Sequence, residues 1–267
     1  MSIYYTGASF APGTENPYDN NRPYNDNWVM VKLLEKADFK HSTGGGNDGI
    51  FRLIITKKHI DWEYRICDFI QYHSSHNKNI IVAVNEIDLN TAQSVYGNQS
   101  YTDNFLKSHE HKILIHSTSK ESYESIMQSG YLYSWNVLQE LGILTEDTPI
   151  GQLLGDPLDY SDYIMFTSGG LGAERVVSAR QQGKLDFNYD VPYIAGARFY
   201  LDANKIADDG LLVRDGIHLK VKDSLFIDKY IIWTVTPDIL GIPEETTPRM
   251  FHEKANAMFE QKFGITL

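Results

Sequence analysis

The chain has 267 residues, of which 42% are hydrophobic and 22% are charged, so it is composed like a globular protein of one large domain or two small ones. Its formal net charge of −11 disfavours non-specific binding of nucleic acids, because the field of the whole molecule repels phosphate backbones. With one cysteine, Cys67, and neither a signal-peptide pattern nor a membrane-length apolar run, we expect a soluble cytoplasmic protein that does not enter membranes.

The first part of the chain predicts an irregular arm followed by a small αβ part. Residues 1–27 are rich in Pro, Gly, Asn and Asp and show no periodicity, which is typical of turns. Residues 28–110 form the αβ part, and the polar stretch 90–103 predicts the connection that follows it. Apolar spacing and β-branched residues predict a helix over 28–37, a glycine loop at 44–46, a strand over 50–56, a helix over 59–73 and a strand over 79–84.

Residues 111–267 predict a second domain of α/β (α+β) class. A short apolar strand at 113–115 ends in His116-Ser117-Thr118. Ser119 then predicts the cap of a helix that ends at Gly130. Further elements are predicted as helices over 136–141, 172–182 and from 248 to the end, strands over 163–166, 195–201, 211–221 and 227–234, and a loop over 149–162.

Two sets of short motifs between residues 113 and 233 resemble known families. The strand end His116-Ser117-Thr118, followed by a helix that ends in Gly-Tyr-Leu, resembles the opening of ADP-ribosyltransferase cores, where the strand ends in His-Gly-Thr. A second series is similar to the RNA 2′-phosphotransferase family, and it consists of Ala173–Gly183, Ala195–Asp202, Asp209-Gly210, Arg214–Leu219 and Tyr230. The resemblance implies an ADP-ribosyltransferase-like split β-sheet that binds NAD.

The sequence departs from the phosphotransferases at two places. It lacks their Arg-His pair in an N-terminal domain, and the strand Tyr163–Phe166 stands where they have a His-rich strand. The resemblance therefore implies NAD binding rather than removal of a 2′-phosphate.

The resemblance also implies roles for individual residues. His116, Ser117 and Thr118 would hold the nicotinamide ribose and amide of NAD. Arg180 or Arg175 would grip the pyrophosphate, since a guanidinium makes forked contacts with phosphate.

Two further candidates would act at the reacting ribose and nicotinamide. Glu174 would supply a carboxylate that stabilises the oxocarbenium-like centre, and Tyr163 would stack on nicotinamide. Each candidate has a structural alternative, because Glu174 also suits a solvated first turn of a helix and Tyr163 a half-buried strand position. A histidine at a strand end, such as His116, is also commonly a hydrogen-bonded structural residue.

These residues predict NAD cleavage with transfer of ADP-ribose to a nucleic-acid or protein acceptor, or to water. Toxins, phage-defence factors and RNA repair use this chemistry. One alternative is a non-catalytic module that binds NAD, ADP-ribose or a nucleic-acid end. Another is a structural or partner-binding protein, which only the aromatic-rich arm from Tyr4 to Trp28 favours. The histidine pairs His73/His76 and His109/His111 lack carboxylate or cysteine partners at metal-site spacing, so we predict surface histidines and no metal site. Nothing in the sequence predicts an oligomeric state.

Overall fold

The computed structural model describes residues 1–267 except 47, 98–109, 145–147 and 154. The chain is a mixed α/β protein that divides into two compact units. The first unit comprises residues 1–102, 151–160 and 214–218, and the second comprises 103–150, 161–213 and 219–267. Two later segments, 151–160 and 214–218, thus belong to the N-terminal unit. The predicted boundaries at 27 and 110 leave both segments out of it. No helix in the described ranges is both long and apolar enough to cross a membrane.

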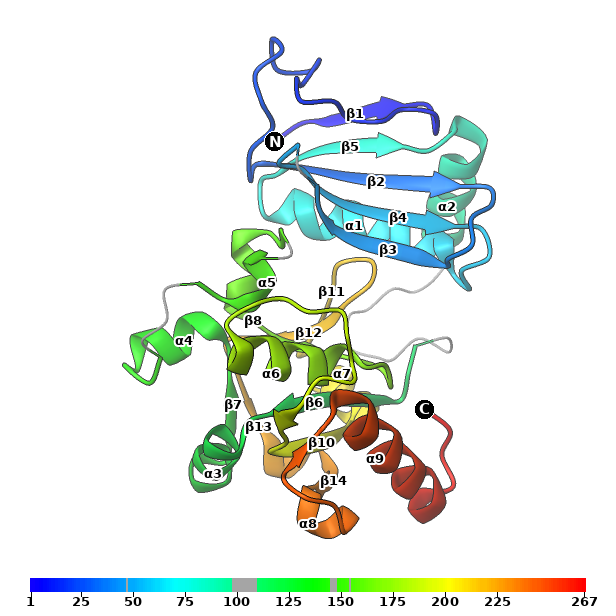
Figure 1. Ribbon diagram of the computed structural model, residues 1–267. Coiled ribbons are helices and arrows are strands. Elements are labelled where there is room, and N and C mark those ends of the chain that lie inside the picture. The colour runs from blue at the N-terminus through cyan, green and yellow to red at the C-terminus, as the bar shows by residue number, and fades with distance from the viewer. Residues whose placement is uncertain (47, 98–109, 145–147, 154) are drawn as a thin grey trace. The chain divides into compact units, whose positions relative to one another are not determined.

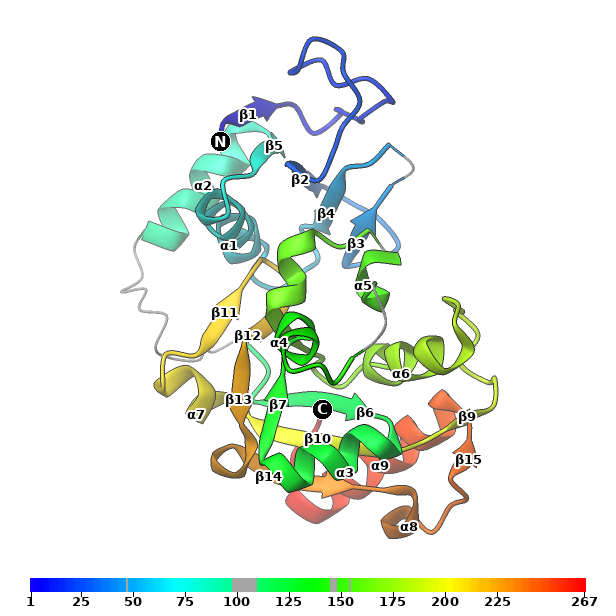
Figure 2. The same ribbon diagram turned by 90° about the vertical axis from the view of Figure 1, so that its left-hand side faces the viewer.

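The first unit is built on a five-stranded sheet of order β1-β5-β2-β4-β3. Its strands are β1 (Ile3–Thr6), β2 (Trp28–Leu34), β3 (His41–Gly45), β4 (Phe51–Thr56) and β5 (Asn79–Ala83). The first four in this order run parallel, and β3 is an antiparallel edge strand. Helices α1 (Trp62–Ser75) and α2 (Glu86–Gly97) pack together on one side of the sheet (Figures 1 and 2).

Three predictions for this unit are wrong. Residues 28–34 are not a helix but strand β2, which lies between β5 and β4 and is buried on both faces. A central parallel strand is apolar nearly throughout, so its pattern also satisfies helical spacing. The arm contains β1, and the expected glycine loop includes the last two residues of β3.

Three other predicted elements of the first unit are of the right type, and one predicted connection is not. The strands near 50–56 and 79–84 and the helix near 59–73 are confirmed as β4, β5 and α1. The expected connection over 90–103 is instead the second half of α2 as far as Gly97. Its remainder lies outside the described residues.

The second unit combines several small sheets. The orders are β14-β10-β6, β11-β12-β8, β13-β7 and β15-β9. The strands are β6 (Ile113–Thr118), β7 (Tyr131–Tyr133), β8 (Tyr163–Phe166), β9 (Tyr193–Ile194), β10 (Ala197–Asp202), β11 (Leu212–Arg214), β12 (Leu219–Lys222), β13 (Ser224–Phe226), β14 (Ile231–Val235) and β15 (Glu245–Thr246). Strands β6 and β8 belong to different sheets and meet at one bridge between Ile115 and Thr167.

The described helices of the remaining chain are α3 (Lys120–Ser129), α4 (Trp135–Glu140), α5 (Ile150–Leu153), α6 (Gly172–Gln182), α7 (Ala203–Asp208), α8 (Pro237–Leu240) and α9 (Pro248–Phe263). They include the four that the sequence predicts, α3, α4, α6 and α9, and three short ones that it does not predict, α5, α7 and α8. The predicted caps of α3 are confirmed, since the Ser119 hydroxyl accepts from Ser122 N–H and Gly130 has a φ of 74°. The expected strand 211–221 is divided into β11 and β12, and 227–229 form a 3₁₀ turn before β14. The predicted loop 149–162 contains α5 and a 3₁₀ turn at 158–162.

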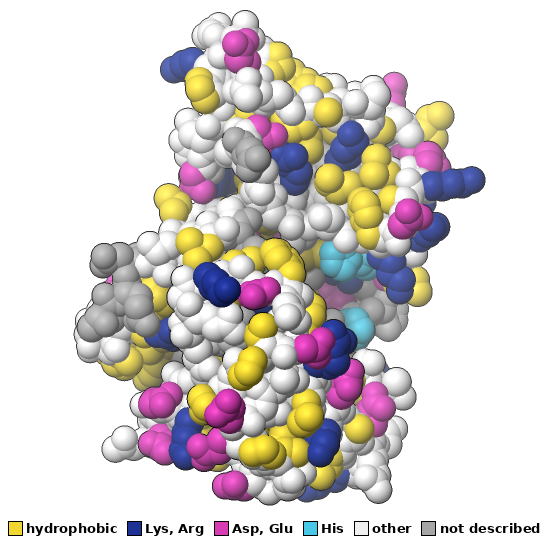
Figure 3. Space-filling model, viewed as in Figure 1, with side chains coloured by type: hydrophobic (Ala, Val, Ile, Leu, Met, Phe, Trp, Pro, Cys, Tyr) yellow, Lys and Arg dark blue, Asp and Glu magenta, His cyan; other side chains and the backbone are white. Residues whose placement is uncertain are grey.

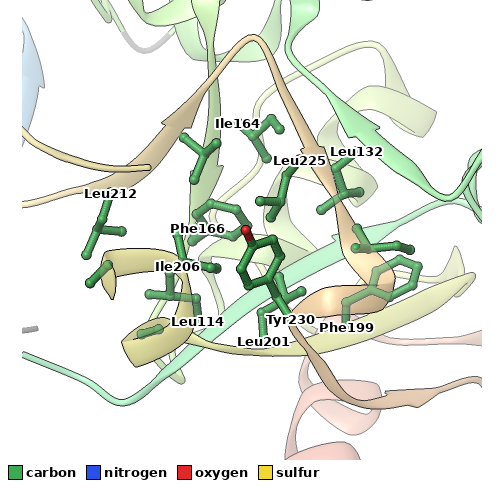
Figure 4. Packing of buried hydrophobic residues seen from close by; sticks show 14 of the residues in the cluster. Leu114, Leu132, Ile164, Phe166, Phe199, Leu201, Ile206, Leu212, Leu225 and Tyr230 are labelled. Atoms are coloured by element: carbon green, nitrogen blue, oxygen red, sulfur yellow. The ribbon is translucent and has the colours of Figure 1, made fainter. Parts of the chain in front are cut away.

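The sheet β14-β10-β6 has a buried apolar cluster on each face. One cluster includes Leu114, Phe166, Phe199 and Tyr230 (Figure 4). The other includes Ile115, Tyr200 and residues of α6 and α9. Consecutive residues of β6 and β10 therefore face different clusters, because side chains alternate along a strand.

Candidate functional site

The carboxyl end of β6 carries the predicted nicotinamide-ribose residues, but they point to two faces. His116 pairs with Phe199 of β10, and Ser117 pairs with Arg198. By strand alternation His116 and Thr118 share the face of Leu114, whereas Ser117 shares the face of Ile115 and helix α6. The structure thus separates Ser117 from the other two candidates.

His116 is half-buried where β6 meets the end of β8. Its ring lies edge-on to Phe166, with centroids 6.2 Å apart, and its Nδ1 is 3.4 Å from the Met165 carbonyl oxygen. Burial lowers the pKa of His116, and the Met165 carbonyl only partly opposes this effect. The imidazole is therefore neutral near pH 7, and with its proton on Nδ1 it presents Nε2 as a hydrogen-bond acceptor.

Thr118 and the turn into α3 lie against Gly196, the residue before β10. A Cβ added to Gly196 would be 2.2 Å from Ser119 C and 2.4 Å from the Thr118 carbonyl oxygen. Real Cβ atoms do not come this close to backbone atoms. Glycine at 196 is therefore required for the turn to take this position beside His116.

We expect Gly196→Ala to destabilise the second unit by about 1–3 kcal/mol, since backbone on both sides must shift to make room for the methyl group. Chemical denaturation would measure this loss. Gly170→Ala is the matched control, because a Cβ there has nothing within 4 Å. Equal stability of the two variants would contradict the close packing of this turn.

On the other face of β6, Glu174 forms a buried ion pair with Arg198. Both side chains have no exposed surface. The Ser117 hydroxyl donates to Glu174 Oε1 at 2.6 Å, and Arg198 Nη1 donates to the same oxygen. Glu174 is therefore not in a solvated first turn; it ties α6 to β6 and β10.

The arginine of this pair is held by further polar groups. Arg198 Nη2 donates to Asn256 Oδ1 at 2.9 Å, and Arg198 Nε donates to the Tyr200 hydroxyl at 3.2 Å. Asn256 Nδ2 donates to the carbonyl oxygen of Gly169 at 3.1 Å, which links α9 to the turn before α6. Burial lowers the pKa of Arg198, but the Glu174 carboxylate and the Tyr200 hydroxyl outweigh burial and raise it. The guanidinium therefore stays charged.

His252 of α9 lies at the edge of this polar cluster. Its Nδ1 is 3.8 Å from Glu174 Oε2, which is too far for a hydrogen bond. Burial, and then the charge of Arg198, lower the pKa of His252, while Glu174 opposes them. At neutral pH the carboxylate is thus balanced by Arg198 rather than by His252.

The structure places the other three candidates as follows. Tyr163 is buried with its ring centroid 4.7 Å from Lys220 Nζ, and by alternation it faces away from the side of β8 that carries Phe166. The structure therefore does not bring Tyr163 to the face of His116. In α6, Arg175 lies over Phe187 at 5.2 Å and Arg180 over Trp135 at 5.7 Å.

Arg198, Asn256 and His252 were not singled out from the sequence. A pattern in the sequence could have indicated Arg198, because it is the one charged residue inside the apolar run Ala195–Leu201. A pattern could also have indicated Asn256 and His252, since they are four residues apart and so share a face of the terminal helix. Neither signal identifies Glu174 as the partner, 24 residues before Arg198.

The predictions of surface histidines and of no metal site can be compared with the structure except at His109, which lies outside the described residues. His73 is fully buried among aromatic rings, so the expectation that it lies on the surface is wrong. Within the described ranges, no group of three or more His, Cys, Asp or Glu side chains is placed to hold a metal ion.

Figure 3 shows basic side chains interspersed with acidic ones on the face that it presents.

Comparison with known proteins found no matching family model, no matching curated protein and no matching solved structure.

Proposed function

We propose that the second unit binds NAD at the carboxyl end of β6 and transfers ADP-ribose to a nucleic-acid or protein acceptor, or to water. The observation that carries this proposal is the placement of His116 and Thr118 on one face of the strand end, directly before α3. Two small sheets meeting at β6 and β8 also agree with an ADP-ribosyltransferase-like split sheet.

The chemistry of these two groups suits a ribose and a carboxamide. A neutral imidazole accepts a hydrogen bond from a ribose hydroxyl, and the Thr118 hydroxyl both donates and accepts. Cleavage of the nicotinamide–ribose bond passes through a positively charged centre, so the enzyme must fix both ends of the dinucleotide. Of the two candidate arginines, the exposed Arg180 is the better placed to reach a pyrophosphate from solvent.

Glu174 takes a positioning role in this proposal. Its carboxylate is bonded to Ser117 and Arg198, so it fixes the end of β6 from behind the face that would hold NAD. The carboxylate that stabilises the oxocarbenium centre is then another group.

A non-catalytic NAD or ADP-ribose binding module is the second candidate function. The burial of Glu174 favours it, because the carboxylate that the resemblance implies for catalysis is already engaged by Arg198. Labelled NAD distinguishes the two, with nicotinamide release followed with and without RNA, DNA and protein acceptors. Release supports transfer, and calorimetric binding of NAD without release supports the module.

We expect His116→Ala to weaken NAD binding by about 1–3 kcal/mol, the cost of lost hydrogen bonds to a ligand. The variant should fold, because the ring is half-buried and its one described hydrogen bond is long. Calorimetry measures the affinity, and His111→Ala, which removes an exposed imidazole just before β6, is the control. Unchanged affinity in His116→Ala, or no NAD binding by the wild type, would refute the proposed site.

A further inference from the structure

A cluster of cationic side chains lies within the first unit, and it contains no residue of the proposed NAD site. The rings of His41 and His59 have centroids 5.2 Å apart. His41 also interacts electrostatically with Arg65, His218 and Lys40, and His59 interacts with Arg65 and Lys40. Three imidazoles and one guanidinium are thus gathered from separate segments of the chain.

The topology of the sheet explains why these residues meet. His41 begins the antiparallel edge strand β3 and pairs with Ile55 near the carboxyl end of β4. His59 lies in the turn between β4 and α1, and Arg65 is in the first turns of α1. Open α/β sheets bind ligands at the carboxyl ends of their strands, where a helix N-terminus favours negative charge.

The fourth member comes from the later segment 214–218. Arg65 Nη1 donates to the carbonyl oxygen of Gly216 at 3.1 Å, which fixes this segment on α1. A Cβ on Gly216 would be 2.6 Å from the Arg65 carbonyl oxygen, so glycine is required for this approach. His218 therefore has a fixed place relative to Arg65.

One acidic group near the cluster pairs with a member of it. Asp215 accepts from the backbone N–H groups of Ile217 and His218 and lies 3.1 Å from His218 Nδ1, so its carboxylate offsets the charge of His218 when that ring is protonated. Asp61 and Glu63 lie at the start of α1 on the side of Tyr64, whose pKa burial and these two charges raise. Lys57 is directed away, to Glu35 and Asp88.

From this juxtaposition we propose that His41, His59, His218 and Arg65 form a binding site for a dianionic phosphoryl group, such as inorganic phosphate or the phosphate of a nucleoside monophosphate. His41 is exposed and the other three are half-buried, so the group reaches them from solvent. Imidazole N–H groups and a guanidinium are donors without acceptors when charged, which matches the oxygens of a phosphate.

Binding is coupled to proton uptake. Surrounding protein atoms, and then the neighbouring cations, lower the pKa of His41 to about 4, and burial lowers that of His59. An anion between the rings raises the pKa of both histidines. The affinity for the anion is therefore highest at a pH below these raised pKa values, and it falls as the pH rises through them. We therefore expect the affinity for the dianion to rise on the order of tenfold between about pH 7 and pH 5.

The test uses the full chain and three probes: sulfate, inorganic phosphate and adenosine monophosphate. Sulfate keeps both charges over the range where histidines titrate, so it isolates the protonation of the protein. We expect its affinity to rise as the pH falls, with proton uptake measured by calorimetry in buffers of different ionisation enthalpy. Phosphate and adenosine monophosphate should compete with sulfate. If adenosine monophosphate binds more tightly than inorganic phosphate, the ligand of the site is the phosphate of a nucleotide rather than a free ion.

The variant His41→Ala/His59→Ala should lose at least tenfold in affinity and the pH dependence with it, whereas His76→Asn, in the same unit, should retain both. Histidine NMR signals of the wild type give a reading that does not depend on any variant, because the pKa of His41 should rise when sulfate is added. An unshifted His41 pKa, binding of sulfate without phosphate, or full affinity in the double variant would overturn the proposal.

Discussion

Replacing Arg198 by Met should lower the free energy of unfolding of the second unit by about 3–5 kcal/mol, because the change leaves the Glu174 carboxylate buried without its counter-charge. Neither side chain of the pair is exposed, so water cannot take over the role of the guanidinium. The Ser117 hydroxyl still donates to Glu174, but a neutral donor does not offset a buried charge. Chemical denaturation combined with amide hydrogen exchange of β6 and β10 locates the loss in this unit.

Two controls distinguish the buried charge from a loss of packing. Glu174→Leu combined with Arg198→Met removes both charges and should recover much of the lost stability. Arg249→Met breaks an exposed ion pair with Asp190, in which the arginine is 45% exposed, and should cost below about 1 kcal/mol. If Arg198→Met costs no more than Arg249→Met, the buried pair is not what fastens α6 to β6.

Elements whose signals are local could be predicted from the sequence. Helix α3 is the clearest case, since Ser119 and Gly130 sit at its two ends and both act as expected. Strand β2 could not be distinguished from a helix, because what decides its conformation is pairing with β4 and β5 on both sides. Those partners lie tens of residues away in the chain.

The candidate site was predictable only in part for the same reason. Alternation along β6 already implies that Ser117 faces away from His116 and Thr118 once the strand is known to run through Thr118. The burial of Glu174 depends on Arg198, and the grouping of His41 with His218 depends on a segment that returns to the first unit. Such contacts are set by tertiary packing and leave no short-range pattern in the sequence.

Truncating Phe199 to Ala should also destabilise the second unit by about 3–5 kcal/mol, since deletion of a fully buried aromatic ring loses its transfer free energy and leaves a cavity. Phe199 has no exposed surface and lies among Leu114, Phe166 and Tyr230 in the cluster of Figure 4. It also stands opposite His116 in the register of β6 and β10, on the same face. The cavity would therefore open beside the imidazole.

This position makes Phe199→Ala a test of how the His116 face is supported. We expect NAD affinity to fall together with stability, because the ring of His116 loses a neighbour that limits its rotamers. Phe187→Ala removes a ring that is 64% exposed and lies under Arg175, and it should cost less than about 1 kcal/mol. Denaturation and calorimetry on both variants supply the comparison. If Phe199→Ala loses stability but keeps full NAD affinity, the dinucleotide does not bind on this face of β6. The loss of stability would still confirm that Phe199 packs in the buried cluster.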